Sequence, residues 1–88
     1  MNSHLDPDFR AAFARLPEAV RHQARIAYRL FQQNPHHPSL HFKPIAPSIY
    51  SVRVGLHYRA LGTQISGNTI VWFWIGSHAE YDRLIQNL

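Results

Sequence analysis

The segment Ile49-Tyr-Ser-Val-Arg-Val-Gly-Leu-His-Tyr-Arg-Ala-Leu-Gly62 sets the architecture of this 88-residue chain, together with Ile70-Val-Trp-Phe-Trp-Ile-Gly-Ser-His-Ala-Glu-Tyr-Asp82. The first segment alternates apolar and polar residues on both sides of a glycine, which predicts two antiparallel strands. The second begins with a nearly continuous apolar run, typical of a strand covered on both faces, and ends in the start of a helix. We therefore expect most of the sheet, and the function of the protein, to lie within residues 49–82.

The turn between the first two strands determines which side chains share a face. If residues 55–57 form a three-residue loop with glycine, a common hairpin connection, Val54 faces Tyr58 and Arg53 faces Arg59. A two-residue loop would instead place Arg59 on the core side, where an unpaired charge is costly. The three-residue loop is therefore the better prediction, and it puts both arginines on the non-core face.

Two helices are predicted before the sheet. Asp6-Pro7 indicates a helix start, because aspartate accepts hydrogen bonds from the free amides of the first turn and proline fits the first helical position. Pro17 opens a second helix, whose apolar residues fall on one broad arc, and Asn34-Pro35 ends it. The short connection between the two predicts an antiparallel helix hairpin.

The remaining segments add an edge strand and a last helix. Residues 40–45 are a short strand candidate, in which Pro44 favours an edge position. Ser77 and Glu80 have the Ser-x-x-Glu spacing of a capping box, which predicts a helix from there towards Leu88. The predicted fold class is therefore α+β: an N-terminal helix hairpin packed on a three- to four-stranded antiparallel sheet, with a short C-terminal helix.

Length and composition limit the class of protein. The length predicts a single domain over residues 1–88, and the net charge of +4, mostly from arginine, favours an acidic or polyanionic partner. The chain has no cysteine, which excludes disulfides, thiolate catalysis and cysteine zinc sites. No run is apolar enough to span a bilayer and the first residues lack a signal-peptide pattern, so we expect a cytoplasmic protein.

Arg53 and Arg59 are the first candidates for a binding site. Two like charges that face each other across a strand pair are destabilising unless a partner compensates them, so the pair indicates a bound anion. The structural alternative is that each arginine pairs with a carboxylate such as Glu80 or Asp82, or lies in solvent.

His78 and Tyr81 are candidates from the predicted last helix. The positive end of the helix dipole disfavours the protonated form of a histidine in the first turn, so His78 could act as a base near neutral pH. Tyr81 would lie beside it as a hydrogen-bond donor or a stacking surface. A histidine at a helix cap is more often structural, and this alternative stays open.

Three other patterns have simpler explanations. The arginines of residues 21–29 form a stripe that is most often a solvated helix face, with docking of an acidic peptide or a nucleic-acid backbone as the alternative. The aromatic residues 72–74 could stack on bases only if one ring is exposed, and core packing is the simpler role. The histidines of residues 36–41 lack the spacing of a metal site, so we predict no metal.

The predicted elements, with Tyr58-Arg59 and the closing motif Gly76-Ser77-His78-Ala79-Glu80-Tyr81-Asp82, together resemble a known group of proteins. This is the RelE/ParE superfamily of toxins from bacterial type II toxin–antitoxin systems, and the closing motif is similar to that of its RelE-like mRNA interferases. The resemblance covers nearly the whole chain. The N-terminal strand that opens many members would be missing here or reduced to residues 2–5.

The resemblance implies an activity and partners. Members of the RelE-like branch cleave mRNA on the ribosome without a metal or other cofactor, by attack of the RNA 2'-hydroxyl on the adjacent phosphate. The expected partners are therefore mRNA on the ribosome and a cognate antitoxin, whose acidic or amphipathic segment would cover the basic face. No membrane partner is expected.

The resemblance also implies roles for single residues. Arg59 matches the arginine that binds the phosphate and would stabilise charge on the phosphoryl oxygens. His78 matches the terminal histidine, which would take the 2'-hydroxyl proton or protonate the 5'-leaving oxygen. Tyr81 falls near the terminal aromatic residue, which positions or stacks on a base. Three further residues complete the predicted RNA- and phosphate-binding set: Arg53, Lys43 and His57.

A second hypothesis is a non-catalytic member of the same fold that binds RNA, a partner peptide or DNA gyrase. Lys43 is the only lysine, whereas some active nucleases of this group have a lysine-rich strand. The terminal His78 argues against the gyrase-poisoning ParE branch.

Overall fold

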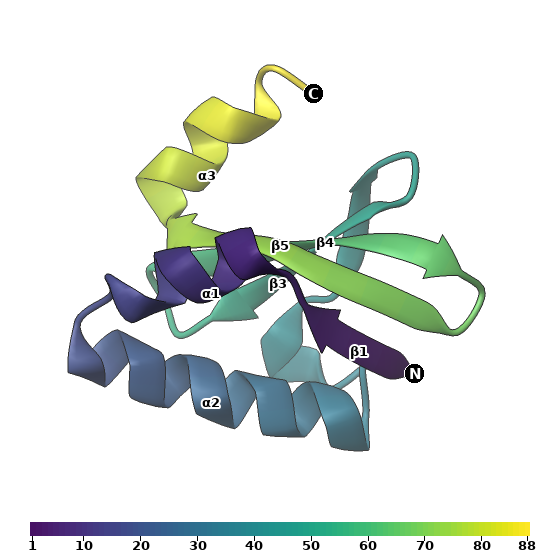
Figure 1. Cartoon of the computed structure of the whole chain (residues 1–88), viewed down its shortest axis with the longest axis horizontal. Helices are drawn as coiled ribbons and strands as arrows, with labels where there is room; N and C mark the ends of the chain where they lie inside the picture. The colour runs from purple at the N-terminus through teal and green to yellow at the C-terminus, as the bar shows by residue number, and fades with distance from the viewer.

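A computed structural model describes all residues 1–88 and contains one sheet with three α-helices around it (Figure 1). The N-terminal half holds β1 (Asn2–Leu5), α1 (Pro7–Ala14), α2 (Glu18–Gln33), a 3-10 turn (Pro38–Leu40) and β2 (Lys43–Ala46). The C-terminal half holds β3 (Ile49–Val54), β4 (Tyr58–Ser66), β5 (Thr69–Ser77) and α3 (His78–Ile85). The α+β class is therefore confirmed.

The sheet has five strands, in the order β1-β5-β4-β3-β2. Four of them form the predicted antiparallel meander, but β1 pairs in parallel with β5, from Asn2 opposite Thr69 to Leu5 opposite Trp72. The prediction of three to four strands, all antiparallel, is thus one strand short, while the reduced N-terminal strand at residues 2–5 is present. A four-residue strand is too short for a clear period, and contacts distant in sequence stabilise it, such as the 2.8 Å hydrogen bond from Trp72 Nε1 to Ser3 Oγ.

The three-residue turn between β3 and β4 is confirmed. Val54 lies opposite Tyr58 and Arg53 opposite Arg59. Gly55 has a φ of +60°, in the left-handed region that glycine adopts without strain. The register of β3 with β4, and the face on which each side chain lies, therefore agree with the alternation of apolar and polar residues.

The two N-terminal helices begin and end close to the predicted residues. Asp6 caps α1 by accepting a hydrogen bond of 2.8 Å from the amide of Phe9. Helix α2 starts directly after Pro17 and ends at Gln33, and the cap residue Asn34 is extended ahead of Pro35. None of the helices combines the length and the apolar character needed to cross a bilayer.

Strand β2 starts later than predicted, at Lys43 rather than residue 40. Residues 38–40 form a 3-10 turn, which the side chain of His37 caps, and His41 then adopts a left-handed conformation with φ of +46°. The strand lies at the edge of the sheet, as predicted from Pro44, which cannot donate to a ladder.

The main core lies between the sheet and the first two helices. Phe31 of α2 is 2% exposed and meets the rings of Phe42 and Trp72 edge to face, at centroid distances of 5.1 and 5.2 Å. Figure 1 shows α2 below the sheet and α3 above it. A second, smaller cluster on the α3 side is made by three buried residues: Ser51, Leu61 and Tyr81.

The capping box at the start of α3 is present with both of its hydrogen bonds. The Glu80 amide donates to Ser77 Oγ at 3.2 Å, and the Ser77 amide donates to Glu80 Oε1 at 2.9 Å. Hydrogen bonding of the Glu80 carboxylate by Ser77, chiefly by its backbone amide and then by its side chain, holds the pKa of this carboxyl below its ordinary value. The box defines the point where β5 becomes α3.

Removing the Phe31 ring should destabilise the fold strongly. We expect Phe31→Ala to lower the free energy of unfolding by about 3–5 kcal/mol, because it leaves a cavity between two aromatic partners. Leu56→Ala is the matched control, since Leu56 is 74% exposed, and it should leave stability nearly unchanged. Urea unfolding followed by circular dichroism measures both, and equal midpoints would contradict the assigned core.

The capping box should give α3 a pH-dependent share of stability. Because the pKa of Glu80 is lowered in the folded state, its contribution is present above the ordinary carboxyl value of 4.5 and is lost as the pH falls below it. Glu80→Gln should weaken this pH dependence, and Ser77→Ala should cost about 1 kcal/mol near neutral pH. Urea midpoints of the three proteins between pH 3 and 7 measure the effect; parallel curves for wild type and Glu80→Gln would refute it.

Candidate functional site

The face of the sheet on the α3 side brings the predicted site residues together. Directly opposed residues in neighbouring strands project to the same side, so the register defines two rows across this face. The first row contains Lys43, Ser51, Leu61 and Trp74, and the second contains Arg53, Arg59 and Gly76. In Figure 1, α3 and the turn between β2 and β3 rise on this same side of the sheet, opposite α2. The side chains of these two rows therefore share one face of the sheet, called here the α3-side face.

Arg53 and Arg59 lie opposite each other with no carboxylate partner. Neither forms any of the ion pairs in the structure, so the alternative in which Glu80 or Asp82 neutralises them is not realised. Arg59 donates from Nη1 to the carbonyl oxygen of its neighbour Tyr58 at 2.8 Å, and Nε of Arg53 is buried without a partner. The sheet thus carries two directly opposed arginines, neither of which forms an ion pair with a carboxylate.

Burial and like charge both act on Arg59. Burial lowers the pKa of its guanidinium from the ordinary value and the charge of Arg53 lowers it further, whereas Tyr81 and Asp82 act in the opposite direction. Arginine remains charged despite such a shift, since its ordinary pKa lies far above neutrality. A phosphate placed between the two side chains would relieve the repulsion and could accept from a planar fork of donors.

His78 is the first residue of α3 and lies where β5 ends. Its amide donates to the carbonyl oxygen of His57 at 2.7 Å, and its Nδ1 lies 3.0 Å from Oδ2 of Asp82, one helical turn later. A carboxylate on Nδ1 orients the ring and favours the tautomer that leaves Nε2 free to exchange a proton. The imidazole is 47% exposed, so substrate can reach it.

Tyr81 is buried, unlike the exposed His78 in the same helix. It is only 6% exposed, its hydroxyl donates to Ser51 Oγ at 3.4 Å, and its ring meets the His78 ring edge to face at 6.0 Å. Tyr81 therefore attaches α3 to the sheet, and its ring packs against the His78 imidazole. In this conformation its ring surface is not open to a base.

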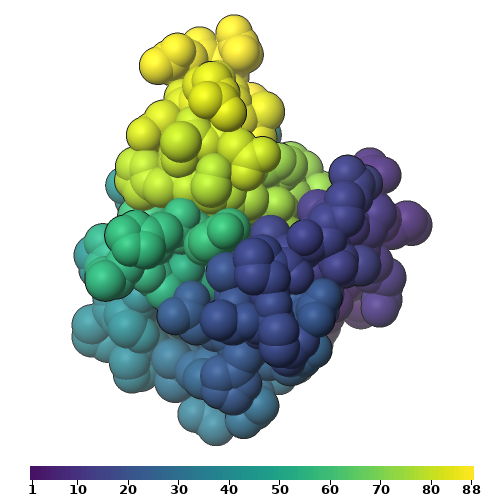
Figure 2. All heavy atoms as spheres, turned by 90° about the vertical axis from the view of Figure 1, so that its left-hand side faces the viewer, coloured from purple at the N-terminus to yellow at the C-terminus, as the bar shows by residue number.

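Lys43 and His57 lie at two margins of the same region. Lys43 is exposed on edge strand β2, opposite Ser51, and His57 is exposed in the turn between β3 and β4. Figure 2 shows that turn (green) directly beneath α3 (yellow), consistent with the bond from His78 to the His57 carbonyl. Lys43 therefore lies on the far side of the sheet face from His78, whereas His57 lies next to His78.

Sequence reasoning missed two partners in this site. Asp82 stands four residues after His78, a spacing at which helical side chains meet, so the contact was visible in principle. Ser51 accepts from Tyr81, thirty residues away in sequence, and no local pattern indicates that bond.

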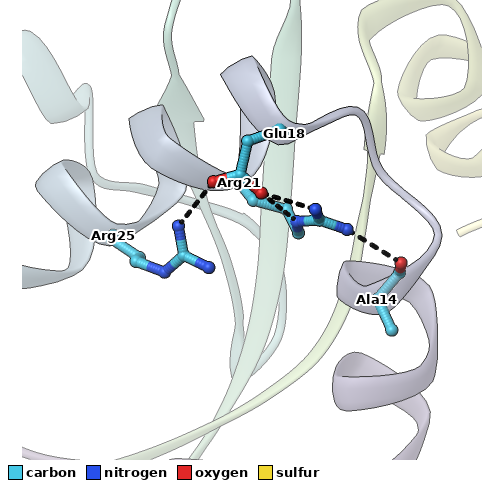
Figure 3. Close-up of polar contacts among 4 residues, drawn as sticks. All are labelled: Ala14, Glu18, Arg21 and Arg25. Atoms are coloured by element: carbon cyan, nitrogen blue, oxygen red, sulfur yellow. Dashed lines mark hydrogen bonds and ion pairs between the residues drawn. The ribbon is translucent and has the colours of Figure 1, made fainter.

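The arginine stripe of α2 has a structural role at its N-terminal end (Figure 3). Arg21 donates to Glu18 and, at 3.2 Å, to the carbonyl oxygen of Ala14, which ties α2 to the end of α1. Arg25 reaches Glu18 at 3.4 Å and lies over the Phe13 ring, 5.5 Å from its centroid. These contacts hold the pKa of Glu18 below its ordinary value, chiefly through the Arg21 hydrogen bond.

Two further features lie away from the arginine pair. His37 caps the 3-10 turn by accepting from the Ser39 amide at 3.2 Å, and no group of three acidic or histidine side chains is close enough to hold a metal ion. An apolar cavity of about 280 Å³ is lined by residues of α1, α2 and the sheet, on the main-core side. Neither feature combines convergent polar groups with the arginine pair.

Comparison with solved structures shows the same fold. The toxin–antitoxin complex RelB-RelE from Methanococcus jannaschii matches with a TM-score of 0.71 at 20% identity, over 91% of this chain and 96% of that chain. The YoeB/ParE toxin from Agrobacterium tumefaciens gives 0.66 at 13% identity, over 89% and 99%. The isolated RelE toxin from E. coli gives 0.64 at 14% identity, over 99% and 98%.

Sequence comparison is more selective. No curated protein matches the chain by sequence. The family model described as the ParE-like toxin domain matches residues 18–83, from the start of α2 to within α3. This match includes the whole antiparallel meander, β2 to β5, and the start of α3 with His78 and Tyr81. The chain therefore belongs to the ParE-like toxin family, within the RelE/ParE superfamily.

Proposed function

We propose that this protein is the toxin of a type II toxin–antitoxin system and that it cleaves mRNA on the ribosome without a metal. The observation that carries the proposal is the uncompensated pair Arg53 and Arg59, next to the partly exposed imidazole of His78. Two fixed cations beside a group that can exchange a proton are the elements needed for phosphoryl transfer from an internal nucleophile.

In the proposed reaction the RNA supplies its own nucleophile. The 2'-oxygen attacks the adjacent phosphorus, the bond to the 5'-oxygen breaks, and the products carry a 2',3'-cyclic phosphate and a 5'-hydroxyl. Arg59 stabilises the charge that builds on the phosphoryl oxygens, with Arg53 beside it. His78 takes the 2'-hydroxyl proton or protonates the 5'-oxygen through Nε2, while Asp82 holds Nδ1. Tyr81 acts as a positioning residue, because its side chain is buried and its hydroxyl bonds to Ser51 of β3.

Lys43, on the edge strand β2, and His57, in the turn between β3 and β4, would bind the RNA backbone at the two margins of the α3-side face. Both are exposed and neither shares an ion pair with a carboxylate of the chain. Contacts of this kind position the strand without reading its sequence.

A cognate antitoxin is the second proposed partner. The M. jannaschii relative is a complex of a toxin with its antitoxin. By analogy, an acidic or amphipathic segment of an antitoxin would cover the α3-side face of this chain, because Arg53 and Arg59 form no ion pair with a carboxylate there.

Substitution of Arg59 or His78 should remove toxicity without unfolding the protein. We expect Arg59→Ala and His78→Ala each to reduce cleavage of a defined mRNA on programmed ribosomes by about 100-fold or more, the usual loss for such groups. Arg29→Ala is the matched control: Arg29 is an exposed arginine of α2, on the opposite side of the sheet, and its removal should change nothing.

Cleavage with and without ribosomes, in excess chelator at a level that leaves ribosomes intact, tests the two finer claims. A substrate with 2'-deoxyribose at the mapped cut should resist cleavage. Full activity of both Arg59→Ala and His78→Ala would refute the assigned chemistry, and cuts on naked RNA would remove the ribosome from it. No cleavage in any condition would favour the binding-only member of the fold, with DNA gyrase as the next target to test.

A further inference from the structure

The aromatic residues of β5 differ sharply in their surroundings. Trp72 is 3% exposed in the main core, and its indole N–H donates to Ser3 Oγ at 2.8 Å. Trp74 lies on the opposite face, in the row of Ser51 and Leu61, and is only partly buried. Its indole N–H has no partner in the protein and is not among the buried unpaired groups. The Trp74 ring therefore keeps contact with solvent on the α3-side face of the sheet.

We propose that Trp74 is the residue on which this face stacks an unpaired base of single-stranded RNA. The inference rests on the proposed function and deepens it, since it names the part of the nucleotide that the site holds besides the phosphate. Base stacking on an aromatic ring is the usual way in which proteins hold single-stranded RNA.

Gly76 makes this placement of the ring possible. A Cβ at Gly76 would lie 2.5 Å from Cζ2 and 2.8 Å from Cη2 of Trp74, so the six-membered part of the indole lies close over the glycine backbone. Oε1 of Glu80 lies 3.1 Å from the same point and bounds the site on the α3 side. Only glycine at this position leaves room for the ring in this orientation.

The same contact brings the indole next to the phosphate site. Gly76 is the direct cross-strand partner of Arg59, and neighbouring strands are about 4.8 Å apart. A ring that covers Gly76 thus lies one strand away from the backbone of Arg59, the residue that would hold the phosphate. A nucleotide whose phosphate binds Arg59 can therefore reach Trp74 with its own base or an adjacent one.

Burial of Tyr81 supports this assignment. Tyr81 is only 6% exposed, and its hydroxyl bonds to Ser51 of the same face, so its ring offers little surface to a base. Trp74 is the aromatic residue of the two rows that keeps contact with solvent. The stacking role therefore falls to the strand rather than to the last helix.

The test is binding of a short RNA that cannot be cleaved, a 2'-O-methyl oligonucleotide with a fluorescent label. Trp74→Leu keeps apolar bulk but removes the aromatic surface, and we expect its Kd to rise by about 5- to 150-fold, the range found for loss of one stacked base. Trp74→Phe should recover most of the affinity. Gly76→Ala should weaken binding as Trp74→Leu does, because it displaces the indole.

Intrinsic fluorescence provides a second measurement on the wild-type protein. The chain has two tryptophans, so RNA should quench the emission of Trp74 while Trp72 stays unaffected. The quenching should vanish in Trp74→Phe, although that variant still binds. This measurement requires no destabilising substitution, and circular dichroism of each variant verifies its fold.

The outcomes separate this inference from the proposed nuclease. Quenching of Trp74 by the uncleavable RNA, combined with no cleavage of mRNA on programmed ribosomes, would support the stacking residue and remove the nuclease. Normal cleavage, with unchanged affinity in Trp74→Leu or no quenching in the wild type, would overturn the stacking residue and keep the nuclease. Absence of oligonucleotide binding and of quenching in the wild-type protein would overturn the stacking residue, and the ribosome assay would then decide the nuclease by itself.

Discussion

The register between β3 and β4 is the constraint on which the rest of the structure depends. A slip of one residue in a strand pair moves every side chain to the other face. A slip of this kind between β3 and β4 would turn charged arginines towards the main core and apolar valines towards the α3-side face. Gly55, in the left-handed conformation, closes the turn at the length that prevents it. The pairing of Arg53 with Arg59 and the burial of Val52 and Val54 are two results of the same turn.

The last helix converts this sheet face into a site. The capping box fixes where α3 begins, and the bond between Tyr81 and Ser51 fixes how it lies on the sheet. Both contacts hold His78 at the end of β5, beside the turn that carries His57. The only cluster that supports α3 is small, so the helix is held by a few contacts rather than by the main core. The proposed proton-transfer group thus stands on one of the less extensively packed elements of the fold.

Family membership and chemistry rest on different observations in this protein. The toxin domain model matches three quarters of the chain, and the solved relatives share its fold at 13–20% identity. At such identity the fold is shared, while each site residue has to be argued from its own surroundings. Those surroundings favour Arg59 and His78 as groups that meet substrate, Tyr81 as their support, and Trp74 as the open aromatic surface.

The sequence by itself determined the elements that depend on local physics. The caps at Asp6 and Ser77 and the turn after Val54 involve groups within a few residues of one another, and they are found as predicted. Alternation likewise assigned Arg53 and Arg59 to one face, because the period of a strand is two residues.

Only the tertiary structure decided the features that join distant segments. These are the parallel pairing of β1 with β5, the burial of Tyr81 against Ser51, and the opposite fates of Trp72 and Trp74. The two tryptophans are separated by an irregularity in the pairing of β4 and β5, which places residues two apart in sequence on opposite faces. Strand alternation alone would put them on one face, so the bulge at Gly62, whose place only the pairing of β4 with β5 reveals, determines which indole meets solvent.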